Sequence, residues 1–250
     1  MFDAITLVII ATFLLAGLVK CVIGLGLPTV SLAILTMAID LPTAMVLLLV
    51  PSFVTNLWQA FGGRDTRAVL ARIWPFLLAA ALTVWIGIQA LRLIELALLS
   101  ALLGALIAIY SGASLGGLRF SISKRLQGWA GPVLGLINGI LTGMTGSFVV
   151  PGVMYLQAIG LGRDALMQAM GMLFAISTLA LGLALQGNDF LSVELGVDST
   201  LALLPALVGM AIGQRVRRAV PERQFRIIFF AALLLLGAYL FYTALSGYYR

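Results

Sequence analysis

The sequence predicts an all-α polytopic membrane protein, and both its composition and its apolar runs support this class. Of the 250 residues, 62 % are hydrophobic and only 10 % are charged, whereas soluble domains are about 45–50 % apolar and about 25 % charged. The apolar residues form long continuous runs, unlike the short alternating segments of a membrane β-barrel. The mean hydropathy of +1.14 and the single cysteine exclude a disordered chain and a disulfide scaffold. We expect one transmembrane domain over residues 1–250.

Ten apolar segments follow one another along the chain. Eight are long enough, or nearly so, to cross a hydrocarbon core of ~30 Å, which requires ~20 helical residues. These eight are residues 4–23, 42–62, 73–91, 94–111, 129–143, 164–186, 199–214 and 225–246. The other two, residues 28–39 and 148–159, would each reach only ~18 Å as a helix, which is too short to cross the membrane.

A glycine-rich break precedes each short segment. The first break reads Gly-Leu-Gly-Leu-Pro over residues 24–28, and the second reads Gly-Met-Thr-Gly-Ser over residues 143–147. Glycine weakens a helix, and proline lacks a backbone N–H. Because the chain must emerge on a definite side at Asp40 and at Arg163, we expect both breaks to lie inside the membrane. Each short segment and its predecessor are interpreted as a broken or re-entrant helical hairpin; tight helical kinks are the alternative.

The two hairpins occupy corresponding positions in two halves of the chain. Residues 17–20 (Gly-Leu-Val-Lys) align with residues 135–138 (Gly-Leu-Ile-Asn) at a spacing of 118, and Gly26 aligns with Gly146 at a spacing of 120. In each half the hairpin is followed by three spanning segments. Five segments is an odd number, so the second half is expected to be inverted. We therefore predict two inverted repeats, one at about 1–118 and one at about 119–250, and such pairs of broken helices indicate a transporter with a midplane site.

The positions of the charges predict which loops face the cytoplasm. If Asp3 lies outside and each segment changes side, 12 of the 15 basic residues fall in inner loops. By the positive-inside rule, both termini are then outside the membrane. The 12 residues are Arg64, Arg67, Arg72, Arg119, Lys124, Arg125, Arg163, Arg215, Arg217, Arg218, Arg223 and Arg226. Because they lie in short loops, with no folded basic module, we expect no nucleic-acid partner.

Absent residue types restrict the chemistry. The chain has no histidine, which excludes imidazole-based acid–base catalysis, Ser-His hydrolysis and imidazole metal sites. We therefore expect no enzyme, no metal and no cofactor. No Asp or Glu lies in the middle of an apolar segment, so a carboxylate proton relay has no evident carrier.

Three sequence runs resemble a known family. They are residues 24–32 (Gly-Leu-Gly-Leu-Pro-Thr-Val-Ser-Leu), 141–151 (Leu-Thr-Gly-Met-Thr-Gly-Ser-Phe-Val-Val-Pro) and 158–165 (Ala-Ile-Gly-Leu-Gly-Arg-Asp-Ala). These look like the two repeat signatures of the sulfite exporter TauE/SafE family, also called the toluenesulfonate uptake permease family, and the resemblance covers essentially the whole chain. It implies a bacterial inner-membrane permease for sulfur-containing anions such as sulfite, sulfoacetate and other organosulfonates. The chain departs from the commoner pattern at Leu25 and Leu27, where a fuller glycine cluster is often found.

The two breaks are the candidate anion site. An anion leaving water needs donors to replace its hydration, and a broken helix offers unpaired N–H groups, a positive dipole end and glycines that permit close approach. Nearby hydroxyls could add further donors, although they could equally be satisfied by their own helices. The candidate substrate-binding residues are Lys20, Gly24, Gly26, Thr29, Ser31, Asn138, Thr142, Gly143, Thr145, Gly146 and Ser147.

Lys20 is the one basic residue inside an apolar segment. Charges within the membrane are functional candidates, and the hairpin interpretation places Lys20 near the tip, where its ammonium would attract an anion. Alternatively, Lys20 could snorkel to the headgroups if the first helix spans the membrane completely. Its counterpart in the second repeat, Asn138, is neutral but can also donate.

The remaining polar residues and the glycine stripes predict contacts between helices. We expect Asn56, Gln59, Gln157 and Gln168 to make interhelical hydrogen bonds. Glycines recur every four residues along one face of the sixth segment and predict close packing against another helix. They are Gly131, Gly135, Gly139 and Gly143, and the pairs Gly209 with Gly213 and Gly112 with Gly116 predict the same.

Taken with the substrate class that the resemblance implies, these features predict export of a sulfur-containing anion. With a negative interior, an anion is driven out by ~2.3 kcal/mol per charge per 100 mV without any ion coupling. The partners would be the small anion and the lipid bilayer, and the location the bacterial inner membrane. A passive anion channel is the alternative, and an intramembrane enzyme using Ser147 with Lys20 is a further one.

Overall fold

A computed structural model describes residues 4–63, 66–118 and 120–248, and in this part of the chain every regular element is a helix. The ten expected segments form eleven helices in the described part of the chain, because the third segment is divided by a bend. They are α1 (Ala4–Ile23), α2 (Leu27–Ala38), α3 (Leu41–Leu47), α4 (Leu49–Phe61), α5 (Thr66–Leu93), α6 (Leu96–Leu115), α7 (Lys124–Thr145), α8 (Gly152–Ala158), α9 (Arg163–Gln186), α10 (Val193–Ala219) and α11 (Glu222–Tyr248). The predicted all-α class is confirmed.

Six of the described helices are long and apolar enough to cross a membrane: α1, α5, α6, α9, α10 and α11. If the bent pair α3 and α4 forms one span, the described helices provide up to seven spans. The eighth expected span, residues 129–143, lies in α7, which is not among the helices that are apolar enough to cross a membrane. Glycines and Asn138 lower the hydropathy of α7, because its surface is specialised for packing.

The third expected segment is bent at Leu48, where the axes of α3 and α4 differ by 45°. Pro51 has no N–H and so cannot donate to the Leu47 carbonyl four residues earlier. Ser199 of α10 replaces that bond, because its hydroxyl donates to the Leu47 carbonyl at 3.0 Å and accepts from the Val50 N–H at 3.1 Å. A proline and a distant serine together fix the bend.

The first break lies where the sequence predicts it, but the second lies further along the chain. α7 continues through Gly143 and ends at Thr145, and the next residue, Gly146, has a left-handed φ of 70°. The helix persists because Gly143 packs against the α5 backbone and because the Thr145 hydroxyl donates to the Leu141 carbonyl at 2.7 Å. α8 begins only at Gly152 and has seven residues, so the predicted start at 148 is wrong.

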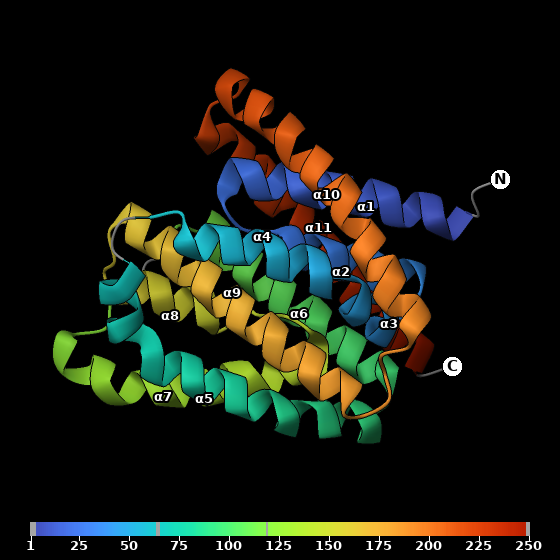
Figure 1. The fold of residues 1–250 in the computed structure, drawn as a ribbon, viewed down its shortest axis with the longest axis horizontal. Coiled ribbons are helices and arrows are strands. Elements are labelled where there is room, and N and C mark those ends of the chain that lie inside the picture. Colours follow the sequence, from blue (N-terminus) through green and yellow to red (C-terminus); the bar gives the residue numbers. More distant parts are fainter. Residues whose placement is uncertain (1–3, 64–65, 119, 249–250) are drawn as a thin grey trace. The chain divides into compact units, whose positions relative to one another are not determined.

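The described helices form two compact units. Unit 1 is drawn from residues 1–51, 94–117 and 190–250, and unit 2 from residues 52–93 and 118–189. Unit 1 contains α1 packed along α10 and α6 packed along α11, whereas unit 2 contains α5 packed along α7 and α9 (Figure 1). Each unit therefore combines helices from both expected repeats.

Glycines bring helix backbones together within each unit. In unit 2, a Cβ added to Gly135 or Gly143 of α7 would meet the main chain of α5. In unit 1, a Cβ added to Gly209 or Gly213 of α10 would meet the main chain of α1. The predicted packing role of these glycines is confirmed. Gly112 differs, because no heavy atom lies within 4 Å of its Cβ position, and the packing role predicted for it is wrong.

Candidate functional site

The first break joins α1 to α2 through three residues of unit 1. Gly24 and Gly26 have φ values of 84° and 117°, which are left-handed conformations that favour glycine. A Cβ on Gly26 would also lie 2.8 Å from the Val19 side chain. Both glycines are therefore required by the path of the chain, independently of any ligand.

The hydroxyl groups after the first break are buried at the start of α2. Thr29 is 4 % exposed and Ser31 is fully buried. The Ser31 hydroxyl donates to the Leu27 carbonyl at 2.7 Å, so its proton is held by its own helix. Ser31 thus stabilises the first turn of α2, whereas the structure gives Thr29 a buried position next to the break.

Lys20 lies in the last turn of α1 and is only 3 % exposed. Its carbonyl accepts the N–H of Gly24 at 2.7 Å and thereby closes the end of the helix. A snorkelling lysine would leave its ammonium at the protein surface, but this side chain is enclosed by protein. Lys20 is therefore buried in the helical turn that leads into the first break.

Asn138 connects α7 to the start of α8 in unit 2. Its side chain is fully buried, and Oδ1 accepts the N–H of Gly152 at 2.9 Å. This bond fixes the orientation of the amide and identifies the other atom as Nδ2. Among the described residues, Nδ2 has no hydrogen-bond partner. An unpaired buried donor costs about 1–3 kcal/mol, and a bound anion would remove that cost.

The hydroxyls around the second break hold the turn in place. Thr142 Oγ1 donates to the Ser147 carbonyl at 3.1 Å, and the Ser147 N–H donates to Thr145 Oγ1 at 3.2 Å. Gly146 occupies the left-handed position, with its N–H bonded to the Thr142 carbonyl at 2.7 Å. Thr142, Thr145 and Ser147 therefore make one buried network, which leaves Asn138 Nδ2 as the unpaired side-chain donor beside it.

The structure brings the candidate residues together in two groups. Lys20, Gly24, Gly26, Thr29 and Ser31 surround the first break in unit 1. In unit 2, Asn138, Thr142, Thr145, Gly146 and Ser147 surround the second break. Gly143 faces the α5 backbone, so its role there is packing.

The glutamines and Asn56 occupy three different environments. Gln59 donates to the Met167 carbonyl of α9 at 2.9 Å, and Gln168 donates to the Ala60 carbonyl of α4 at 3.1 Å, which confirms the predicted interhelical bonds. Asn56 donates to Ser52 of its own helix at 2.9 Å. Gln157 is exposed on α8.

Sequence reasoning missed a buried polar cluster in unit 2. The Ser52 hydroxyl bonds the hydroxyl of Thr178 in α9 at 3.2 Å, and both side chains are almost fully buried. The adjacent Ser177 hydroxyl has no partner among the described residues. The signal was the Ser52-x-x-x-Asn56 spacing, which places two polar side chains on one face of an apolar helix.

Comparison with known proteins gives one match. The family model described as sulfite exporter TauE/SafE matches residues 9–240, which includes both breaks. No curated protein and no solved structure matches the chain.

Proposed function

The chain belongs to the sulfite exporter TauE/SafE family, and we propose that it exports sulfur-containing anions through a site built on its broken helices. Membership makes it a membrane transport protein of a sulfite exporter family and not an enzyme. The proposal concerns the finer points: the anions carried, the residues that bind them, and the direction of transport.

The unpaired Nδ2 donor of Asn138 is the observation that carries the proposed site. Sulfite and sulfonates present oxygen atoms that accept hydrogen bonds, and a buried neutral donor replaces water around such an anion. Asn138 also fixes the N–H of Gly152, so its amide is held in position before the anion arrives. A preorganised donor loses little freedom on binding, which favours affinity.

In unit 1, Lys20 is the candidate residue that carries a positive charge. It occupies the position equivalent to Asn138 at the spacing of 118 residues, immediately before the first break. Lys20 is buried in the last turn of α1, next to the break. Basic side chains inside a membrane protein often lie on ion pathways, so we assign Lys20 to anion attraction within unit 1.

The packing of α1 with α10 and of α5 with α7 supports two inverted repeats. Aligned at a spacing of 130, the proline inside α5 matches the one inside α10, at positions 75 and 205. A Cβ on Gly17 would meet the carbonyl of Ala206, and a Cβ on the equivalent Gly135 would meet the carbonyl of Phe76. Ala206 and Phe76 are also 130 residues apart, so the two contacts are equivalent.

A second pair of contacts follows the same spacings, seven residues further along α5 and α10. The Leu136 carbonyl accepts the Thr83 hydroxyl at 3.0 Å in unit 2. In unit 1 the equivalent Leu18 carbonyl lies 2.6 Å from the Cβ position of Gly213, and Gly213 is equivalent to Thr83 at the spacing of 130. The agreement over two positions supports one helix pairing used twice.

The contact of α6 with α11 is reciprocal. A Cβ on Gly104 would lie 2.6 Å from the Phe241 nitrogen, and a Cβ on Gly237 would lie 2.9 Å from the Ala108 nitrogen. At a spacing of 133 residues, Gly237 is equivalent to Gly104 and Phe241 to Ala108. Exchanging the helices reproduces the same contact, as in a two-fold symmetric interface. This supports α6 and α11 as the matching last helices of the two repeats.

The direction follows from charge and membrane potential. We propose a bacterial inner-membrane location with both termini outside, because that orientation puts most basic residues inside. A negative interior drives an anion outward by ~2.3 kcal/mol per charge per 100 mV. Export then needs no coupling ion.

Flux through purified protein in liposomes tests the proposed function. Vesicles loaded with sulfite, sulfoacetate or an aryl sulfonate are diluted, and efflux is compared with protein-free vesicles. A permease gives saturable efflux that other sulfur-containing anions inhibit by competition. Efflux that rises linearly with concentration would favour the channel alternative, and no efflux of any of the three anions would refute the proposal.

A further inference from the structure

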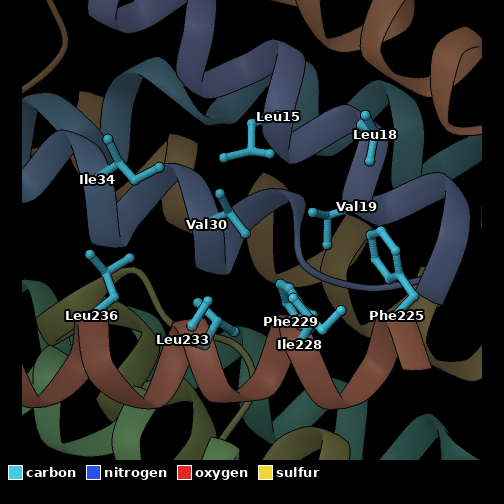
Figure 2. A pocket seen from close by; sticks show the side chains of 11 residues that line it. Leu15, Leu18, Val19, Val30, Ile34, Phe225, Ile228, Phe229, Leu233 and Leu236 are labelled. Carbon is cyan, nitrogen blue, oxygen red and sulfur yellow. The ribbon is translucent and has the colours of Figure 1, made fainter. Parts of the chain in front are cut away.

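Unit 1 contains a cavity of about 380 Å³ that is lined by apolar side chains. α1 and α2 form one wall, with Val30 and Ile34 on α2, and α11 forms the opposite wall (Figure 2). The edge of the cavity is open, because Leu15 is 45 % and Ile228 is 68 % exposed. An occupant could therefore enter the cavity from this side.

The shape of the cavity suits an extended hydrocarbon chain. Along α11 it runs from Phe225 to Leu236, which is ~16 Å at the helical rise of ~1.5 Å per residue. No polar side chain lines it, so nothing in its walls would bind a polar head. The groove formed by these residues is called the α11 groove below.

Arginines gather at the Phe225 end of the α11 groove. Arg223 and Arg226 flank Phe225 in the first turns of α11, and both are exposed. α10 adds Arg217 and Arg218 in its last turn, shortly before α11 begins at Glu222. Residues 215–226 contain five arginines against one acid, Glu222, so this end has a positive charge.

We propose that the α11 groove binds one acyl chain of an anionic phospholipid, with the phosphate at the arginine-rich end. An amphiphile with a hydrocarbon chain and a negatively charged head matches both the apolar walls and the basic end. The chain would lie against Val19 and Phe229, which are the two side chains packed around Gly26. A bound lipid would therefore stabilise the first break.

Lipid retention by the purified full-length protein tests the proposal without measuring transport. The protein is mixed with equal amounts of dioleoyl phosphatidylglycerol and dioleoyl phosphatidylcholine, and native mass spectrometry counts the retained lipids. Ala232→Phe fills the groove, and the smaller change Ala232→Leu covers the case in which Phe prevents folding. Ala238→Phe is the matched control, because Ala238 is exposed on the same helix and does not line the groove.

The acyl-chain site and the head-group position each have their own expected result. The wild type and Ala238→Phe retain phosphatidylglycerol about tenfold more than phosphatidylcholine. Filling the groove removes that retention, and replacing Arg223 and Arg226 together by Gln removes the preference for the anionic lipid. Retention unchanged by both Ala232 substitutions, or lost equally in Ala238→Phe, would overturn the acyl-chain site. An undiminished anionic preference in the double arginine variant would overturn the assigned head position.

Discussion

At the scale of single residues, two buried side chains at equivalent positions in the sequence carry the proposed chemistry. Asn138 and Lys20 are each placed by a break, and each is almost completely enclosed. The breaks themselves have structural explanations, because Gly24, Gly26 and Gly146 adopt left-handed conformations and the threonines bond within the chain. The proposed chemistry is therefore concentrated on two groups and not spread over the whole glycine-rich sequence.

Asn138→Asp removes the unpaired donor while keeping the oxygen that accepts the Gly152 N–H. We expect sulfite affinity to fall about ten- to hundredfold, because a hydrogen bond to a charged group contributes about 1.5–3 kcal/mol and the new carboxylate repels the anion. Isothermal titration of the purified variant measures the change. Gln157→Glu makes the same substitution at an exposed amide of α8 and should bind as the wild type does. Unchanged affinity in Asn138→Asp would remove Asn138 from the site.

Lys20→Ala tests the proposed charge of the first break. We expect transport to fall strongly at unchanged membrane abundance, because the anion loses its one buried basic partner in the described part of unit 1. Lys124→Ala, which removes an exposed charge at the start of α7, should transport normally. Efflux normalised to membrane protein is the measurement. Wild-type efflux from Lys20→Ala would show that the lysine has another role.

At the scale of elements, interruptions and glycine contacts decide where each helix begins and ends. The first break was predictable because two glycines and Pro28 occur together within five residues. The predicted position of the second break was wrong because Gly143 has the sequence context of a helix-breaking glycine. In the structure Gly143 lies within α7 and packs against α5. The bend at Leu48 was not predictable, because its partner Ser199 is about 150 positions away in the chain and nothing local identifies it.

Ser199→Ala tests how the bend between α3 and α4 is stabilised. Removing the hydroxyl leaves the Leu47 carbonyl and the Val50 N–H without the bonds that Ser199 makes. We expect a loss of about 1–3 kcal/mol, and Tm falls about 2–4 °C per kcal/mol for a chain of this size. Thr200→Ala is the control, because its exposed hydroxyl bonds only its own helix, at the Gly196 carbonyl. Equal Tm values for the two variants would contradict the assigned bridge.

At the scale of the whole molecule, repeated helix contacts are the main evidence for symmetry. Direct alignment of the two halves of the sequence matches residues at and just before the two breaks, and identity between the halves is low elsewhere. Equivalent residues of α5 and α10 are 130 positions apart, and those of α6 and α11 are 133 positions apart. Both spacings follow from contacts between helix backbones. The proposed repeats therefore rest on backbone contacts, which close packing by small residues requires at only a few positions.

Inversion predicts that the first turns of α5 and α10 lie on opposite sides of the membrane. Arg67 and Val193 are each replaced by a single cysteine in a Cys21→Ala background. Both positions are exposed and therefore open to labelling. In intact cells, a membrane-impermeant maleimide should label the Val193→Cys protein only, because that side is predicted to be outside. Arg67→Cys should react only after the cells are opened. Labelling of both positions from one side would refute the inverted arrangement.

The central claim is that the protein moves sulfur-containing anions down their electrochemical gradient without a coupling ion, and voltage-driven efflux tests it most directly. Proteoliposomes loaded with sulfite, with no proton or sodium gradient, are given a potassium diffusion potential that is negative inside. We predict efflux that rises with the potential, saturates with sulfite and is unchanged when proton or sodium gradients are added. Efflux that requires either gradient, or that does not exceed that of protein-free vesicles, would contradict the account.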